Sequence, residues 1–333
     1  MRNKNMLWQP KAAVFLPNSL EEWKENIKYM KAMIREVLED YNLLQYTKED
    51  VKLFDGFSVD FFLEKFNLAI KIDDIVTRNS GKAFFGLTKI EDDTPFIEWK
   101  KTNELGIRVI HAYETEIFNE NKWNIFKNMI TYSCNLSHRI FARNTKVQIK
   151  KAVELKPMFM KNNIQGYRNA KTAFVLVDKN TEEPLMCYTV GHSFFGKGAY
   201  DAEIARGCCI TNYKNTGLGI QVIGGASKLW KTILNYYSEK DINDNPGQVN
   251  SIVYYTDSRY YDGRSIKHLM DSPTLPGKVE TLKMTASFTN YWTELGVAKN
   301  REPNRHSFIM QQMREGKILV IPNPGTVTYC YKR

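Results

Sequence analysis

The sequence lacks any hydrophobic run near the roughly 18 residues that a membrane-spanning helix needs. Residues 1–10 lack the apolar segment of a secretory signal. No internal repeat or low-complexity tract is present. Hydrophobic residues make up 43% and charged residues 25% of the chain, which is enough apolar material to build a core. We therefore exclude a collagen-like or wholly disordered protein and expect no membrane partner.

Cysteine is scarce: the 333 residues contain five, with no CxxC motif. An odd, sparse set argues against a disulfide framework or a Cys-rich zinc site and favours a reducing compartment such as the cytoplasm. Cys208 and Cys209 are adjacent. They could act in redox or nucleophilic chemistry. More commonly, such a pair serves as two small apolar residues at the end of a strand.

Negative charge is depleted in only one part of the chain. Residues 1–145 hold 21 Lys and Arg and 21 Asp and Glu, whereas residues 146–333 hold 26 and 16. The whole net charge of +10 therefore belongs to the second part. This asymmetry predicts a domain boundary near residue 145 and favours a polyanion partner, most simply double-stranded DNA, over charge kept for solubility alone.

Hydrophobic spacing predicts the main elements. Residues 19–40 are expected to form an amphipathic helix that a capping box begins, and residues 57–73 a β-hairpin. A helix is expected over 149–163, interrupted by Pro157. Two late strands, 317–321 and 326–331, are expected to flank a Pro-Asn-Pro-Gly turn.

The first part places an acidic residue on one strand of the hairpin and polar residues at the end of the next. Metal-dependent nucleases of the PD-(D/E)xK type need this layout, because carboxylates from neighbouring strands converge on Mg²⁺, which activates water. Residues 30–140 resemble the very-short-patch-repair endonucleases and their phage homing-endonuclease relatives. The matching stretches are Val59–Phe62, Leu68–Asp74, Trp99–His111 and Glu114–Glu116.

This resemblance implies that Asp60 is the metal-binding aspartate. Asp73 stands where the relatives usually have Asn or His, and Asp73 or Asp74 could serve as a further Mg²⁺ ligand. Lys71 departs from the family, because it stands where the homing relatives often have Glu. An ammonium group there would repel Mg²⁺ unless another ligand compensates. Further catalytic candidates are Lys100 and Lys101, which could steady the scissile phosphate, and Glu114.

The order of elements in the second part is that of the GNAT acyltransferase fold. In that fold, backbone N–H groups at a helix N-terminus hold the pyrophosphate of acyl-CoA or another acyl-type donor. The glycine-rich segment after the strand 202–209 lies in the corresponding place. A loop followed by a small-residue helix contact is the alternative. The candidate cofactor-binding residues are Gly217, Gly219, Gly224, Gly225, Ser227 and Lys228.

Residues 138–295 are more closely similar to the C-terminal module of the phage homing-type proteins, which itself resembles the Mom-type DNA-modification proteins. The Gly224–Leu229 and Asp257–Arg259 blocks are the most specific matches. The resemblance implies a phage-encoded protein acting on DNA in the bacterial host cytoplasm. The residues expected to contact DNA phosphates are Arg206, Lys214, Arg259 and Arg264.

We thus expect an α/β (α+β) protein with a restriction-endonuclease-like domain over 1–145. A basic, GNAT-like domain with a mixed central sheet should follow over 146–333. The first functional hypothesis is a metal-dependent DNA endonuclease of the homing type. The second is a Mom-like or GNAT-like group transferase that modifies DNA bases, with a degenerate nuclease domain serving DNA binding. The third is a DNA-binding protein with neither activity.

Overall fold

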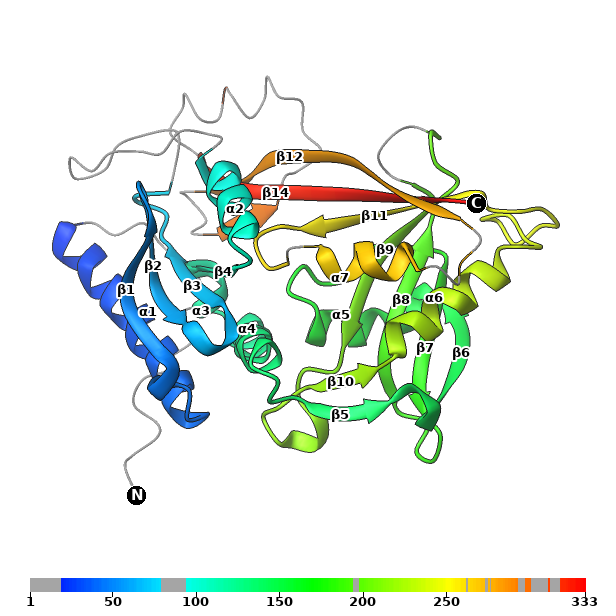
Figure 1. Ribbon diagram of the computed structural model, residues 1–333, viewed down its shortest axis with the longest axis horizontal. Coiled ribbons are helices and arrows are strands. Elements are labelled where there is room, and N and C mark those ends of the chain that lie inside the picture. Colours follow the sequence, from blue (N-terminus) through cyan, green and yellow to red (C-terminus); the bar gives the residue numbers. More distant parts are fainter. Residues whose placement is uncertain are drawn as a thin grey trace. The chain divides into compact units, whose positions relative to one another are not determined.

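The chain is a mixed α/β protein, as predicted (Figure 1). The computed structural model describes residues 19–78, 94–193, 198–261, 263–272, 275, 277–292, 297–300, 311 and 318–333.

The chain forms two compact units, and neither is continuous in sequence. The first comprises residues 1–127, 257–262 and 285–326, and the second comprises 128–256, 263–284 and 327–333. Charge balance predicted one boundary near residue 145. In the structure the second unit begins at residue 128, and two later segments, 257–262 and 285–326, belong to the first unit.

Helix α1 (Leu20–Asp40) opens the first unit. The side chain of Ser19 caps it by accepting a hydrogen bond from the backbone N–H of Glu22, as the capping pattern predicted. Its buried residues recur at helical spacing and form one apolar face. They are Met30, Met33, Ile34, Val37 and Leu38.

The first unit contains a four-stranded sheet in the order β1-β2-β3-β4. The predicted hairpin of β2 and β3 is confirmed, and Asn67 turns it with a φ of 46°. Strand β4 pairs with β3 in parallel, a connection that passes through helix α2. The remaining bounds are β1 (Thr47–Phe54), β2 (Phe57–Leu63), β3 (Leu68–Asp73), α2 (Thr94–Glu104), β4 (Arg108–Tyr113), α3 (Glu114–Ile117) and α4 (Glu120–Ser133), which ends in the second unit.

The second unit is built on a larger mixed sheet. Within this unit the strands of the sheet follow the order β12-β14-β11-β9-β8-β7-β6. Strands β6 to β9 are antiparallel, whereas β11 pairs with β9 in parallel. A separate parallel pair joins β5 to β10. The bounds are β5 (His138–Phe141), β6 (Thr145–Lys151), α5 (Lys156–Asn162), β7 (Thr172–Asp178), β8 (Pro184–Gly191), β9 (Ala202–Cys209), β10 (Ile220–Ile223), α6 (Gly225–Tyr236), β11 (Ser251–Asp257), α7 (Arg264–Met270), β12 (Lys278–Trp292) and β14 (Ile318–Lys332). Strand β13 (Val297–Asn300) and parts of β12 and β14 belong to the first unit.

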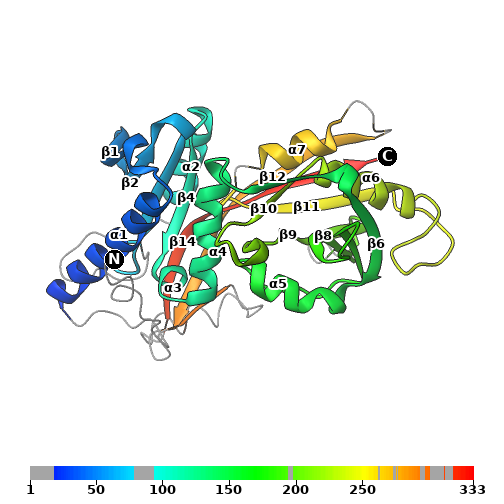
Figure 2. The same cartoon turned by 90° about the horizontal axis from the view of Figure 1, so that it is seen from below.

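Strand β7 lies in the middle of this core, and its two faces meet different helices. Ala173, Val175 and Val177 are fully buried in one cluster with Phe159 of α5. Phe174 points to the other face, where its ring packs edge-on against Tyr236 and Tyr237 at the end of α6. Figure 2 shows α5 and α6 on opposite sides of the sheet. The alternation of side chains along a strand therefore builds a three-layer core.

Two local predictions were wrong. Residues 149–151, the expected start of a helix, instead end strand β6, in which Val147 and Ile149 alternate with polar residues at the strand period. Pro157 lies in the first turn of α5, where a missing N–H costs nothing. The expected pair of late strands is one strand, β14, with Gly325 at a φ of 86°.

Replacing Gly225 with Ala should destabilise the protein although alanine has the higher helix propensity. A Cβ at this position would lie 2.7 Å from Val222 Cγ1 and 3.0 Å from Leu176 Cδ1. We expect a loss of about 1–3 kcal/mol in urea unfolding, because overpacking outweighs the propensity gain of roughly 1 kcal/mol. Ser227→Ala, an exposed change in the same turn, is the control. An unchanged or higher stability of Gly225→Ala would contradict this packing.

Candidate metal centre and nucleic-acid interface

Asp60 on β2, the predicted metal ligand, is held between two lysines. Its Oδ1 lies 3.2 Å from Nζ of Lys31 on α1, and its Oδ2 lies 3.6 Å from Nζ of Lys71 on β3. Oδ2 also accepts a hydrogen bond of 2.7 Å from the backbone N–H of Ile72. Nζ of Lys31 also lies 2.5 Å from Oδ1 of Asp50. Lys31, Asp50, Asp60 and Lys71 are called the Asp60 cluster below.

The ammonium group of Lys31 is firmly charged in this cluster. Burial opposes the charged form, but the hydrogen bond to Asp50 and the charge of Asp60 outweigh it, so the pKa of Lys31 is raised above its ordinary value. Lys31 is not among the site residues predicted from the sequence. It lies four residues after Ile27 and three before Ile34, so helical spacing places it at the edge of the apolar face of α1.

Asp73, at the end of β3, belongs to a second charged group that is almost fully buried. Its Oδ1 accepts a hydrogen bond of 2.5 Å from Arg78, and its Oδ2 lies 2.5 Å from Nδ1 of His111 on β4. Arg78 also donates to both carboxylate oxygens of Glu98 on α2, at 2.7 and 3.2 Å. These four residues are called the Asp73 cluster.

Burial alone would raise the pKa of Asp73, but the charges of Arg78 and His111 outweigh it and hold this pKa far below its usual range. Burial disfavours the charged form of Arg78 too, yet Asp73 and Glu98 raise its pKa above the ordinary value. Both groups are therefore ionised across the physiological range, and each already has its counter-ion.

Asp74 and Glu114 are committed to the turn after β3. Oδ1 of Asp74 accepts hydrogen bonds from Trp23 Nε1 and from the backbone N–H groups of Val76 and Thr77, at 2.8 to 2.9 Å. Glu114, at the start of α3, accepts one from the backbone N–H of Ile75 at 3.2 Å. These carboxylates fix the backbone around residues 74–77.

The donor set at Asp60 does not fit Mg²⁺. That ion takes oxygen ligands at about 2.1 Å and would have to approach between two ammonium groups. Across the part of the chain that the structure describes, no three Asp, Glu, His or Cys side chains gather where they could hold a metal. Lys100 and Lys101 are exposed on α2, and Nζ of Lys101 lies 5.2 Å from the ring centroid of Phe54.

Arg259, predicted to contact DNA, is buried in the first unit. Its guanidinium pairs with both carboxylate oxygens of Asp257 and lies over the rings of Tyr113 and Tyr260. Its backbone carbonyl accepts a hydrogen bond from the N–H of His111. The Asp257–Arg259 block therefore binds the edge of β4, and a paired, buried guanidinium is not available to phosphates.

Tyr260 completes this contact by donating a hydrogen bond from its hydroxyl to Glu116, which is buried. Burial raises the pKa of Glu116 and holds the pKa of Tyr260 well above its ordinary value. The Tyr260 hydroxyl therefore keeps the proton that it donates to Glu116.

In the second unit the predicted glycines lie around β10 and the start of α6. Gly217 is exposed with a φ of 77°, and its N–H donates to the side chain of Asn212. Gly219 is buried so closely against the Asn128 side chain that no Cβ fits. Gly224 begins α6 with a φ of 74°. These glycines allow tight turns and close packing.

Lys228 and Ser227 differ in what they could offer a ligand. The ammonium group of Lys228 donates to the carbonyl oxygens of Ala142 and Thr145, at 3.0 and 2.5 Å, so it ties α6 to the turn before β6. Burial lowers the pKa of Lys228. Ser227 is exposed in the first turn of α6.

The strand pair β5–β10 carries an exposed surface of cations and apolar side chains. The register places Arg139 beside Gln221 and Phe141 beside Ile223. Phe141 and Ile223 are 45% and 36% exposed, and the guanidinium of Arg143 lies 4.8 Å from the Phe141 ring centroid. The β5–β10 face comprises Arg139, Phe141, Arg143, Ile223 and the adjoining Lys214.

Lys214 lies near the start of β5, next to two aromatic rings. Its Nζ lies 5.1 Å from the ring centroid of Tyr213, and that ring lies 5.7 Å from His138 on β5. Of the other predicted DNA contacts, Arg264 is exposed on α7, and Arg206 on β9 donates to the carbonyl of Ala205.

The cysteine pair on β9 fits the packing interpretation. Burial raises the pKa of Cys209 to about 12 and that of Cys208 well above its ordinary value. Thiols with such pKa values stay protonated and are poor nucleophiles.

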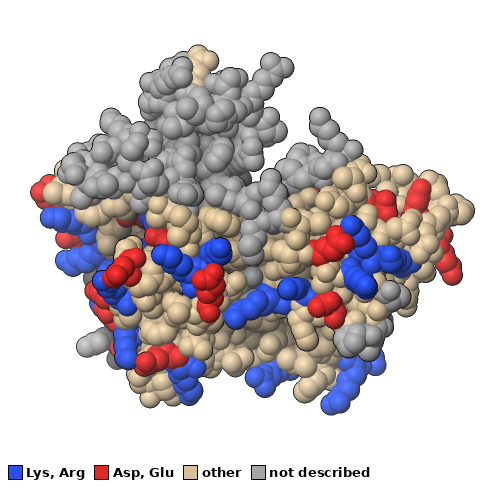
Figure 3. Space-filling model, turned by 45° about the horizontal axis from the view of Figure 1, so that its top comes forward, with Lys and Arg blue, Asp and Glu red and all other residues tan. Residues whose placement is uncertain are grey.

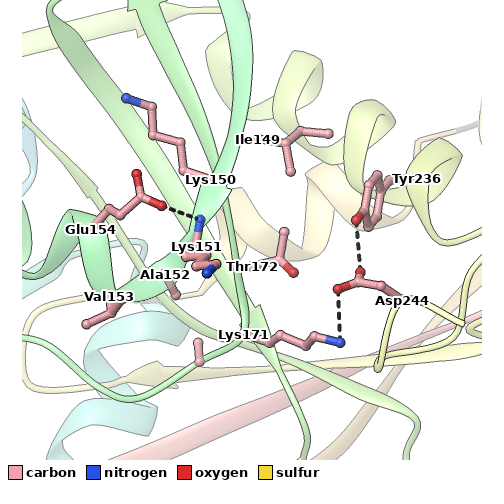
Figure 4. A pocket seen from close by; sticks show the side chains of 11 residues that line it. Ile149, Lys150, Lys151, Ala152, Val153, Glu154, Lys171, Thr172, Tyr236 and Asp244 are labelled. Atoms are coloured by element: carbon pink, nitrogen blue, oxygen red, sulfur yellow. Dashed lines mark hydrogen bonds and ion pairs between the residues drawn. The ribbon is translucent and has the colours of Figure 1, made fainter.

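A cavity of about 610 Å³ opens beside β6, and its polar groups largely satisfy one another (Figure 4). Lys171 pairs with Asp244 at 2.9 Å, and the hydroxyl of Tyr236 donates to the same carboxylate. Lys150 and Lys151 add positive charge to its lining. We assign this cavity no ligand.

Comparison with known proteins gives a weak likeness to a solved structure. No family model and no curated protein matches the chain. The catalytic domain of the homing endonuclease I-Bth0305I is similar to 31% of this chain and 91% of its own, at 16% identity and a TM-score of 0.24. A TM-score of 0.24 does not establish a shared fold. None of the described helices combines the length and apolarity needed to cross a bilayer.

Asp73→Asn should destabilise the first unit in a pH-dependent way. Because the pKa of Asp73 is lowered on folding, its ionised form adds stability above the unfolded pKa near 3.9, and this is lost as the pH falls below that value. We expect a loss of about 3 kcal/mol at pH 7 that shrinks below pH 4, measured by urea unfolding. Asp55→Asn, whose side chain is 99% exposed, is the control. A loss that is independent of pH would contradict the charge pairing.

Proposed function

We propose that this protein binds double-stranded DNA through the β5–β10 face of its second unit. The observation that carries the proposal is a local absence of acidic residues. Residues 121–153 contain seven Lys and Arg, residues 204–238 contain four, and neither segment contains Asp or Glu. Strand β5 comes from the first segment and β10 from the second. Their pairing joins the two acid-free segments at one surface.

The side chains on this face suit a phosphate backbone. Arg139, Arg143 and Lys214 are exposed, so they can exchange water and counter-ions for phosphate oxygens. Phe141 supports the Arg143 guanidinium from one side, which restricts the rotamers that binding would otherwise have to freeze. Figure 3 shows a view in which Lys and Arg are interspersed with Asp and Glu over much of the surface.

Replacing Arg139, Arg143 and Lys214 together with Ala should weaken binding and flatten its salt dependence. Each phosphate contact that is lost should lower the slope of log K against log salt by about 0.9, so the triple variant should lose roughly 2–3 units of slope. We expect at least about tenfold weaker binding of a labelled 30-base-pair duplex near 0.1 M salt, measured by fluorescence anisotropy.

The matched control removes three exposed lysines elsewhere in the same unit, Lys156, Lys267 and Lys278. Its net charge equals that of the test variant. An equal loss of affinity in the control would mean that total charge, and not the β5–β10 face, binds the duplex. A wild-type protein that binds no DNA at low salt would contradict the proposal outright.

One observation favours a second candidate, a group transferase that takes an acyl-type donor. Strands β9 and β11 pair in parallel over three residue pairs, from Ala202 to Ile204, and α6 follows β9 along the chain. Ligands of α/β proteins commonly bind beyond the carboxyl ends of parallel strands, with anionic groups at the following helix N-terminus. Ser227 is exposed in that first helical turn.

For this candidate, acyl-CoA at tenfold its Kd should raise Tm by about 3 °C in a thermal-shift assay. Ser227→Asp should abolish the shift by repelling the phosphates, while leaving the unliganded Tm equal or higher, because an acidic side chain stabilises a helix N-terminus. Ser238→Asp, an exposed change just beyond the end of α6, is the control. An equal shift in wild type and Ser227→Asp would remove this candidate site.

A further inference from the structure

The Asp60 cluster is balanced in charge without a metal ion. It contains two carboxylates, Asp50 and Asp60, and two ammonium groups, Lys31 and Lys71. The side chain of Asp60 is 11% exposed, so its charge is largely removed from water and requires a partner. The two lysines and the Ile72 N–H supply that partner at both carboxylate oxygens.

The ammonium groups come from different elements and approach opposite oxygens of Asp60. Lys31 reaches Oδ1 from α1, and Lys71 reaches Oδ2 from β3. A cation entering the space before this carboxylate would meet positive charge on both sides. The neighbouring carboxylates cannot be recruited instead, because Asp73 pairs with Arg78 and His111, and Asp74 accepts four hydrogen bonds.

We propose that Lys31 and Lys71 take the place of a divalent cation beside Asp60, so that the first unit binds no catalytic Mg²⁺ there. In place of a metal ion, the ammonium groups stabilise the buried carboxylate. Through their ion pairs with it they connect α1, β2 and β3. Asp60 is then a structural counter-ion and not a metal ligand. This inference does not depend on where the second unit binds DNA.

Binding of Mn²⁺, followed by loss of the free-ion signal in electron paramagnetic resonance, tests the proposal without reference to activity. We expect wild type and Asp60→Asn to bind the same amount of Mn²⁺. One more ion bound by wild type than by Asp60→Asn would overturn the proposal. Asn keeps the size of the side chain, and circular dichroism would verify the fold of both proteins.

The reverse experiment restores carboxylates. Lys31→Glu with Lys71→Glu should create a site for one additional Mn²⁺ per chain, and added Mn²⁺ should raise the Tm of this variant. Lys28→Glu with Lys52→Glu, two exposed lysines in the same unit, makes the same charge change away from Asp60. If the double variant does not fold, Lys71→Glu alone is used. A folded variant that gains no ion over the control would show that the lysines are not what excludes the metal.

Discussion

Buried carboxylates in the first unit must each find a positive or hydrogen-bonding partner, and this requirement organises the sheet around them. An unpaired buried charge costs several kcal/mol, whereas a paired one connects the elements that supply its partners. Asp60 draws Lys31 and Lys71 together, and Asp73 draws Arg78 and His111. Helices α1 and α2 are therefore fixed to the sheet by ion pairs as well as by apolar packing.

The same requirement decides what the carboxylates can do. A catalytic metal site needs oxygen atoms that are preorganised and still available to an ion. In this unit the oxygens of Asp60, Asp73 and Asp74 already accept from lysine, arginine or backbone N–H groups. The second unit differs, because the β5–β10 face leaves Arg139 and Arg143 exposed. We therefore propose DNA binding by the second unit and a structural role for Asp60.

Much of the fold could be predicted from the sequence, because the signals for helices and turns come from residues close together in the chain. Ser19 and the apolar spacing fixed α1, and alternation with the turn at Asn67 fixed the β2–β3 hairpin. The last three residues of strand β6 were expected to begin a helix, because so short a stretch of Ile and Lys fits either period. Two domains were expected, but the discontinuous make-up of the two units could not be foreseen, because residues 257–262 belong to the first unit although they are far from it in sequence.

The site was harder to predict than the fold. Lys71 was recognised as a departure from the nuclease relatives. Lys31, the other lysine beside Asp60, lies 40 residues earlier, on a helix whose sequence pattern indicates only core packing. Arg259 looked like a DNA contact, since nothing in its local sequence shows that Tyr113 and Glu116 would enclose the segment around it. The roles of Lys31 and Arg259 are set by partners far away in the sequence. Such long-range contacts leave no periodic pattern from which they could be predicted.

The most direct test is to incubate the full chain with long double-stranded phage and bacterial DNA in Mg²⁺, in Mn²⁺ and in EDTA. Each sample is then divided between a native mobility-shift gel and a denaturing gel. Our account predicts a salt-sensitive protein–DNA complex under all three conditions and strands of unchanged length. Strand cutting that requires the metal ion and disappears in Asp60→Ala would contradict it.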